Sequence, residues 1–287
     1  MKFEGPLEVA EALRAADYLA DERIAQVVSL AVQLDKPVLV EGPAGVGKTE
    51  LAKAMAAVTS RRLIRLQCYE GLDEAKALYE WNYKKQLLRI QSDVDRDWDT
   101  ISHDIFSEEF LLTRPLLEAI RSIEPVVLLI DEVDRVEVET EALLLEILSD
   151  FQVSVPELGT MRANTQPLVF LTSNNTRELS EALKRRCLFL HIDYPDPERE
   201  QAILNARVPG LSEHLAGQVA KVARSIRSLD LKKAPSVSET IDWARTLIAL
   251  SVEEVDEDVL GDTLHVLLKY QADIDKAAKE LTSSPAG

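Results

Sequence analysis

Eight consecutive residues carry the strongest chemical signal in this sequence. They are Gly42, Pro43, Ala44, Gly45, Val46, Gly47, Lys48 and Thr49. The pattern Gly, four residues, Gly-Lys-Thr is that of a phosphate-binding loop, whose glycines let successive backbone N–H groups turn inward around a polyphosphate. The lysine adds a positive charge near the β- and γ-phosphates, and the threonine hydroxyl can hold Mg²⁺. We therefore predict that this loop binds a polyphosphate with Mg²⁺.

The segments on either side place the loop in the context that phosphate binding requires. The apolar run Pro37–Glu41 predicts a strand before the loop, and Glu50–Met55 predicts a helix after it. This helix would aim the positive end of its dipole at the phosphates, so we count Glu50 with the nucleotide-binding residues. The alternative is a glycine-rich turn that matches by chance, and the strand–loop–helix order argues against it.

Two acidic residues follow a second apolar run. Val126–Ile130 has the composition of a strand buried on both faces of a parallel sheet, and Asp131 and Glu132 come directly after it. An unpaired buried carboxylate is costly, which favours a metal ion nearby over a packing role. We predict that Asp131 holds Mg²⁺ through water and that Glu132 polarises the water attacking the γ-phosphate. An acidic loop after a core strand is the alternative.

Polar residues also flank two later apolar runs. Asn174 follows the predicted strand Pro167–Leu171, where its amide could hydrogen-bond the γ-phosphate or the attacking water. Arg185 and Arg186 precede the predicted strand Leu188–Ile192. A planar, always-charged guanidinium suits a neighbouring subunit's γ-phosphate. Without the other motifs, the asparagine would be read as a turn residue and the arginines as solvated surface.

The order of these motifs resembles that of the AAA+ ATPases. Three longer phrases, Leu66–Asp73, Ala77–Tyr83 and Leu148–Val153, resemble the MoxR branch, in the subgroup that includes the carbon monoxide dehydrogenase maturation ATPase. The similarity runs from about Val9 to about Asp273. It implies a homo-oligomeric ring, usually a hexamer, that hydrolyses ATP at subunit interfaces. It also implies a chaperone for a protein client, often a metal-cofactor enzyme, with a partner that carries a von Willebrand factor A domain.

The resemblance assigns roles to further residues. It makes Arg186, beside the last predicted strand, the finger that acts on the neighbouring subunit, with Arg185 as the alternative. Tyr18 and Leu19 lie where AAA+ proteins usually pack the adenine, although they could equally form a hydrophobic staple before the next helix.

One position departs from the pattern of the family. Many relatives carry an arginine at the start of the third lid helix, and Ser238 stands there in this chain. Lys232 and Lys233 are possible substitutes just upstream, although lysines near a helix start are usually solvated. The departure leaves the coupling between lid and nucleotide open, whereas it does not affect the prediction of hydrolysis.

The elements that must position these residues follow one plan. Apolar runs that alternate with helical patterns predict an α/β fold with a parallel sheet and helices on both faces. The resemblance implies that this is an AAA+ P-loop core. After Ile192 the pattern is helical only, and Ser236–Glu239 forms a capping box. We predict a nucleotide-binding domain over 1–193 and a small helical lid over 194–287, with a frayed tail.

Two insertions interrupt the predicted core, at about 69–114 and 151–167. Members of the MoxR branch carry an insertion in their second helix, and Phe151–Met161 resembles an extra hairpin of the same clade. Both are candidates for contact with a client, because loops on a rigid scaffold commonly carry binding. For Trp81 and Tyr83 we favour the alternative that these aromatic side chains pack beneath the insertion.

Composition limits the classes of function. The net charge of −17, from 50 acidic and 33 basic residues, disfavours sequence-independent binding to nucleic acid. Two cysteines, Cys68 and Cys187, cannot frame a secreted scaffold and predict reduced thiols in the cytoplasm. No stretch approaches the ~20 apolar residues of a membrane span, so we expect no direct membrane insertion.

The sequence favours an ATP-driven remodelling ATPase over two alternatives. One is a nucleotide-dependent binding scaffold, in which ATP only sets the assembly state. The other is a small-molecule kinase with the same phosphate loop, which Glu132 and Asn174 disfavour because they suit water activation.

Overall fold

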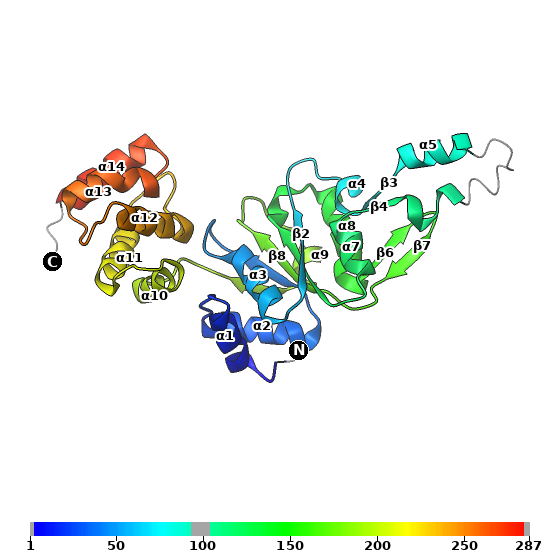
Figure 1. The fold of residues 1–287 in the computed structure, drawn as a ribbon, viewed down its shortest axis with the longest axis horizontal. Coiled ribbons are helices and arrows are strands. Elements are labelled where there is room, and N and C mark those ends of the chain that lie inside the picture. Colours follow the sequence, from blue (N-terminus) through cyan, green and yellow to red (C-terminus); the bar gives the residue numbers. More distant parts are fainter. Residues whose placement is uncertain (1–2, 93–103, 284–287) are drawn as a thin grey trace.

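A computed structural model describes residues 3–92 and 104–283 of the chain (Figure 1). Its centre is a sheet of five strands in the order β2-β5-β8-β1-β9. All neighbouring strands are parallel, as the continuous apolar runs predict. The strands are β1 (Val38–Glu41), β2 (Arg62–Gln67), β5 (Val126–Asp131), β8 (Leu168–Ser173) and β9 (Leu188–His191).

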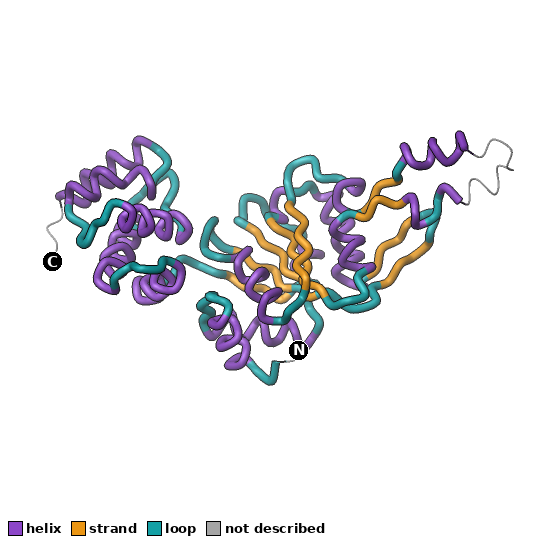
Figure 2. The backbone as a smooth tube through the Cα atoms, in the orientation of Figure 1, coloured by secondary structure: helices purple, strands orange, loops and turns teal. Residues whose placement is uncertain are grey.

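Helices cover both faces of this sheet (Figure 2). On one face, Val127 and Leu129 of β5 belong to the core that also buries α1, α2 and α3. On the other face, Leu128 and Ile130 belong to the core that buries α7 and α8. The strand is therefore apolar at every position because each face has its own helical cover. The helices are α1 (Pro6–Ala15), α2 (Glu22–Leu34), α3 (Lys48–Val58), α7 (Pro115–Arg121), α8 (Val138–Asp150) and the short α9 (Glu181–Lys184).

Two small antiparallel two-stranded sheets extend from the core, on the side opposite the C-terminus of the chain (Figure 2). We call them hairpins. The first pairs β3 with β4 within the span from 69 to 114, and the second pairs β6 with β7 after α8. Their elements are α4 (Glu74–Ala77), β3 (Tyr79–Trp81), α5 (Tyr83–Ser92), the 3-10 turn η1 (Glu108–Phe110), β4 (Leu111–Thr113), β6 (Gln152–Val155) and β7 (Gly159–Arg162).

The aromatic residues of the first hairpin do not share one environment. Trp81 is 7% exposed and makes edge-on contacts with Tyr79 and Phe106, so the packing interpretation is correct for this residue. Tyr83 is 61% exposed at the start of α5, and the packing interpretation is wrong for it.

The remainder of the described chain is helical. We call α10 to α14 the C-terminal helical region; it has its own apolar core and lies at the opposite end of the molecule from α5 (Figure 1). The capping box that the sequence predicts is present, because Ser236 accepts from the backbone of Glu239 and the Glu239 carboxylate accepts from the Ser236 N–H. The helices are α10 (Pro197–Arg207), α11 (Glu213–Arg227), α12 (Val237–Ala249), α13 (Glu257–Leu267) and α14 (Gln271–Ser283).

Two predictions about the ends and the cysteines can be compared with this fold. The predicted frayed tail lies partly outside the described residues, which end at 283. Cys68 is buried and Cys187 is half-buried, and neither forms a disulfide. Burial raises the pKa of both thiols to about 12, so both are protonated and unreactive at neutral pH.

No helix among the described residues has the length and apolar composition to cross a membrane.

A buried ion pair fixes the start of α12. The guanidinium of Arg227 donates two hydrogen bonds to the Glu200 carboxylate, at 2.6 and 2.7 Å, and Glu200 is fully buried. Arg227 also donates to the Pro235 carbonyl at 2.8 Å and to the Thr240 hydroxyl at 3.1 Å. One side chain thus holds α10, α11 and the first turn of α12 together.

We expect the variant Arg227→Met to lose about 3–5 kcal/mol of unfolding free energy, because Glu200 would remain buried without its partner. Urea unfolding of the C-terminal helical region measures the loss. The matched control is Arg245→Met, whose ion pair with Asp242 is exposed, and it should cost less than about 1 kcal/mol. Equal losses in the two variants would contradict this account.

Candidate functional site

The loop between β1 and α3 has a backbone that favours glycine at three positions, Gly42, Gly45 and Gly47, the last with φ 99°. At the first two positions a side chain would also collide with its surroundings. Gly42 has φ 149°, and a Cβ there would lie 1.9 Å from the carbonyl oxygen of Ile192. Gly45 has φ 73°, and a Cβ there would lie 2.5 Å from the side chain of Ser236, the N-cap residue of α12. The loop is therefore packed closely between the core and the C-terminal helical region.

Lys48 is buried beneath this loop. Its ammonium donates to the carbonyls of Gly42 and Pro43, at 2.7 and 2.6 Å, and to Oδ1 of Asn174 at 2.9 Å. Burial lowers the pKa of Lys48, although the carboxylates of the neighbouring acidic loop oppose the shift. The three acceptors are uncharged oxygens, so this buried positive charge fits an anionic ligand such as a polyphosphate.

Asp131 is the centre of a hydrogen-bond network at the end of β5. Its Oδ1 accepts from the hydroxyls of Thr49 and Thr172, at 2.9 and 2.6 Å. Its Oδ2 accepts two hydrogen bonds from the guanidinium of Arg65 on β2, at 3.0 and 2.5 Å. The carboxylate is only 3% exposed, and these donors compensate its burial. Asp131 and Thr49 are thus in contact, close enough for both to contribute to one Mg²⁺ site.

Glu132 adopts an unusual backbone conformation beside this carboxylate. It is a non-glycine residue in the left-handed region, with φ 58° and ψ 48°, which costs conformational free energy. Its N–H donates to the hydroxyl of Thr172 at 2.9 Å, and this bond fixes the turn. The Glu132 side chain is partly exposed and lines the same pocket as Lys48 and Thr49.

Asp134 joins this turn to the loop after β8. It accepts from the backbone N–H groups of Asn174 and Thr176 and from the Thr176 hydroxyl. Burial acts to raise the pKa of Asp134, but these hydrogen bonds outweigh it and hold the pKa below its usual value. Asp134 therefore fixes the backbone of Asn174, whose side chain meets Lys48.

These residues surround an open pocket of about 600 Å³. We call it the phosphate pocket, since it contains the phosphate loop and both acidic residues after β5. Its lining includes Ala44, Gly45, Gly47, Lys48, Thr49, Glu50, Asp131, Glu132, Thr172, Asn174 and Ser238.

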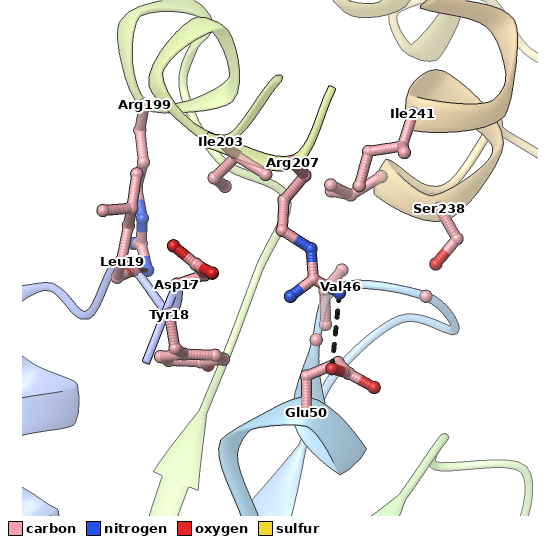
Figure 3. Close-up of a pocket in the computed structure, with 13 residues that line it drawn as sticks. Asp17, Tyr18, Leu19, Val46, Glu50, Arg199, Ile203, Arg207, Ser238 and Ile241 are labelled. Atoms are coloured by element: carbon pink, nitrogen blue, oxygen red, sulfur yellow. Dashed lines mark hydrogen bonds and ion pairs between the residues drawn. The ribbon is translucent and has the colours of Figure 1, made fainter. Parts of the chain in front are cut away.

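A second pocket of about 680 Å³ adjoins the first. Figure 3 shows its residues converging from the chain before α2, from the phosphate loop and the start of α3, and from helices α10 and α12. Tyr18 and Leu19 are part of its lining, together with Val46, Ile203 and Ile241. Burial raises the pKa of Tyr18, so its ring stays neutral. We call this largely apolar hollow the base pocket, because its shape and lining suit a nucleobase.

Two arginines of α10 enter the base pocket, and the sequence analysis missed both. Arg199 donates to Asp21 at 2.6 Å and to the Leu19 carbonyl at 2.9 Å. Arg207 reaches Glu50 of α3 at 3.5 Å (Figure 3). Each ion pair joins α10 to the core, and the arginines belong to no motif that a sequence search could detect.

The lysines considered as substitutes for a lid arginine lie elsewhere. Lys232 stacks on the ring of Tyr270, with the ammonium 4.1 Å from its centre. Lys233 pairs with Glu239 at 3.2 Å, and neither lysine lines the two pockets. Ser238 does line both, so the residue at this position faces the site although it carries no charge.

Arg185 and Arg186 lie outside the two pockets. Arg186 donates to the Ala182 carbonyl at 2.9 Å and to the hydroxyl of Ser149 at the end of α8. Arg185 is 80% exposed and lies 3.9 Å from Glu181. Within one subunit, neither arginine takes part in the site.

The donor set fits ATP with Mg²⁺. The buried ammonium of Lys48 and the N-terminus of α3 suit the phosphates, while Thr49 and Asp131 supply oxygen ligands of the kind that Mg²⁺ takes. The base pocket and the phosphate pocket adjoin, as a nucleotide requires.

We expect Thr172→Val to destabilise the core by about 1–3 kcal/mol. Thr172 is 1% exposed, and valine would leave the Glu132 N–H without its acceptor and Asp131 with one donor fewer. Urea unfolding of the variant measures the effect. Thr172→Ser retains the hydroxyl and is the control, so equal stability of the valine and serine variants would refute the network.

Two known proteins resemble the chain over most of its length. The chain is 25% identical to an uncharacterised protein of Staphylococcus epidermidis over 239 residues, which are 81% of this chain and 83% of that protein. It is 24% identical to an uncharacterised protein of Staphylococcus haemolyticus over 265 residues, 88% and 94% of the two chains.

The chain also resembles a solved structure and matches a protein family. A mutant form of RuvB from Thermotoga maritima has the same fold at 17% identity, with a TM-score of 0.54 over 99% of this chain and 80% of that one. Residues 37–187, more than half of the chain, match the AAA domain (dynein-related subfamily). The α/β fold with a helical C-terminal region is thereby confirmed, and the chain belongs to this AAA family and is an AAA+ ATPase.

Proposed function

We propose that this ATPase acts as an oligomeric ring that remodels or matures a client protein. The observation that carries the proposal is the convergence of Lys48, Thr49, Asp131, Glu132 and Asn174 on one pocket. These residues come from the ends of two adjacent parallel strands, β5 and β8, and from the start of α3 after β1. They combine phosphate binding, metal binding and water activation, which a binding module would not need together.

In the proposed mechanism each residue has one task. Lys48 and the loop N–H groups neutralise phosphate charge, while Thr49 and Asp131 hold Mg²⁺, which supplies charge neutralisation at the phosphates. Glu132 accepts a hydrogen bond from the attacking water and orients it. Asn174, whose amide oxygen is held by Lys48, places its amide group toward the same water.

Glu132 favours hydrolysis over transfer to a small-molecule acceptor. The Thr172 hydroxyl holds the strained turn of Glu132, and Glu132 lines the phosphate pocket. Its position therefore matches the role of a residue that activates water. This supports an ATPase against the kinase alternative.

We propose that the ring forms with Arg186 directed at the nucleotide of the neighbouring subunit. The bonds to Ser149 and Ala182 use two of the five N–H donors of the guanidinium and hold it in place. The exposed Arg185 is the alternative finger. A hexamer is the ring size that the resemblance to the MoxR branch supports.

The two hairpins are the proposed contacts with the client. Three apolar side chains of α5 are largely exposed, namely Tyr83, Leu87 and Leu88.

We propose that the C-terminal helical region is the lid of the site. We also propose that the domain boundary lies between 193 and 194, and that the hairpin spans are insertions. Hydrolysis would then move the hairpins with the subunit interface.

Resemblance to the MoxR branch supports a metal-cofactor enzyme as the client and a von Willebrand factor A protein as a partner. The net charge of −17 supports a protein client over nucleic acid. A scaffold that uses ATP only to set its assembly state is the competing proposal.

We expect Glu132→Gln to bind ATP with affinity near that of the wild type and to hydrolyse it about 10²–10⁴-fold more slowly, because the amide is not a base. Calorimetric binding and phosphate release measure the two quantities. If this variant still supports client maturation in full, the scaffold proposal replaces the motor.

A mixing experiment tests catalysis at the interface between subunits. We expect the double variant Arg185→Ala/Arg186→Ala to lose about 10³–10⁵ in hydrolysis rate, as removal of an arginine finger does. The Glu132→Gln protein retains both arginines, so mixing the two inactive proteins should restore measurable hydrolysis at the mixed interfaces. The two single arginine variants identify the finger. Wild-type turnover by the double variant, or turnover by a monomer, would contradict the proposal.

A further inference from the structure

The base pocket and the phosphate pocket share four residues. They are Gly45, Gly47, Glu50 and Ser238. A nucleotide with its base in one pocket and its phosphates in the other must pass its sugar between these residues. Glu50 is the one charged side chain in the shared set, so the chemistry at the sugar position centres on its carboxylate.

Glu50 is held at this position from two sides. It lies in the first turn of α3, and its Oε1 accepts from Lys53 of the same helix at 2.6 Å. Its Oε2 faces Arg207 of the C-terminal helical region at 3.5 Å (Figure 3). The pair joins residues 157 positions apart in the sequence and spans the junction of the two pockets.

The geometry of α10 directs Arg207 to this junction. Arg199, Ile203 and Arg207 are spaced four residues apart, so they lie along one face of the helix, and all three line the base pocket. Arg199 is tied to Asp21 at one end of the pocket, and Ile203 covers its middle (Figure 3). Arg207 is left at the end that adjoins the phosphate loop.

From this arrangement we propose that Glu50, held by Arg207, selects ribonucleotides by accepting hydrogen bonds from the ribose hydroxyls. An ionised carboxylate has only acceptor sites, and the vicinal hydroxyls of ribose are donors. A carboxylate plays the same part for the ribose of dinucleotides in another fold. The proposal rests on the proposed nucleotide binding at this site, and it adds Glu50 as the residue that recognises the ribose.

Asp17 is the other carboxylate of the base pocket, and its position argues against the same role. It lines the base pocket but not the phosphate pocket, whereas Glu50 lines both. Glu50 is also partly exposed, with 41% of its side chain accessible, which leaves room for a ligand hydroxyl beside Lys53 and Arg207.

The test compares ADP with 2′,3′-dideoxy-ADP, which lacks both hydroxyls, by titration calorimetry of the full chain with Mg²⁺. We expect the wild type to bind ADP at least about tenfold more tightly, the usual effect of a hydrogen bond to a charged group. Glu50→Ala should reduce the ratio of the two dissociation constants to about two or less, mainly by weakening the binding of ADP. Arg207→Gln should give an intermediate ratio, since the carboxylate remains but loses its positioning contact.

Arg199→Gln is the matched control on the same helix face. It removes an ion pair between α10 and the core but not one at the sugar, so it should weaken both nucleotides alike and leave the ratio unchanged. A wild-type ratio below two, or a Glu50→Ala protein that keeps the wild-type ratio, would overturn the inference. If Arg199→Gln also lost the preference for ADP, the inference would be overturned, because contact between α10 and the core would then explain the preference without Glu50. Failure of the wild type to bind either nucleotide would instead refute the proposed nucleotide site.

Discussion

One carboxylate, Asp131, holds together the edge of the sheet that carries the candidate site. It accepts hydrogen bonds from Thr49 after β1, from Arg65 on β2 and from Thr172 on β8. These residues belong to segments far apart in the sequence, and parallel pairing brings their ends to one edge. A buried carboxylate must be compensated by donors, so the burial of Asp131 requires all of these segments to be in place.

The same requirement gives the site its order before any ligand arrives. The Thr172 hydroxyl that donates to Asp131 also accepts from the N–H of Glu132, and it fixes the left-handed turn of that residue. Asp134 has a similar effect on the neighbouring loop, because its carboxylate accepts a hydrogen bond from the backbone N–H of Asn174. Preorganised groups of this kind lose little freedom on binding, which benefits catalysis.

The C-terminal helical region meets the core through small residues and charges. Gly45 has no side chain, so Ser236 can approach the phosphate loop closely. Arg227 and Glu200 hold the start of α12 at this distance, while Arg199 and Arg207 connect α10 to Asp21 and Glu50. The ion pair inside the region is buried, whereas the two across the junction are partly exposed. Exposed pairs contribute less free energy, so this junction is easier to open than the helical region itself.

The sequence by itself determined the sheet, the phosphate loop and the acidic residues after β5. These features are local: a strand, a turn and a helix in succession specify the loop, and an apolar run followed by carboxylates specifies a buried strand end. Only the tertiary structure decided the parts played by Arg65, Thr172 and Arg207. Each is a single polar residue in an ordinary strand or helix, and its partner is 41 to 157 positions away. The environments of Trp81 and Tyr83 were decided in the same way, because packing of a hairpin depends on contacts that no local pattern encodes.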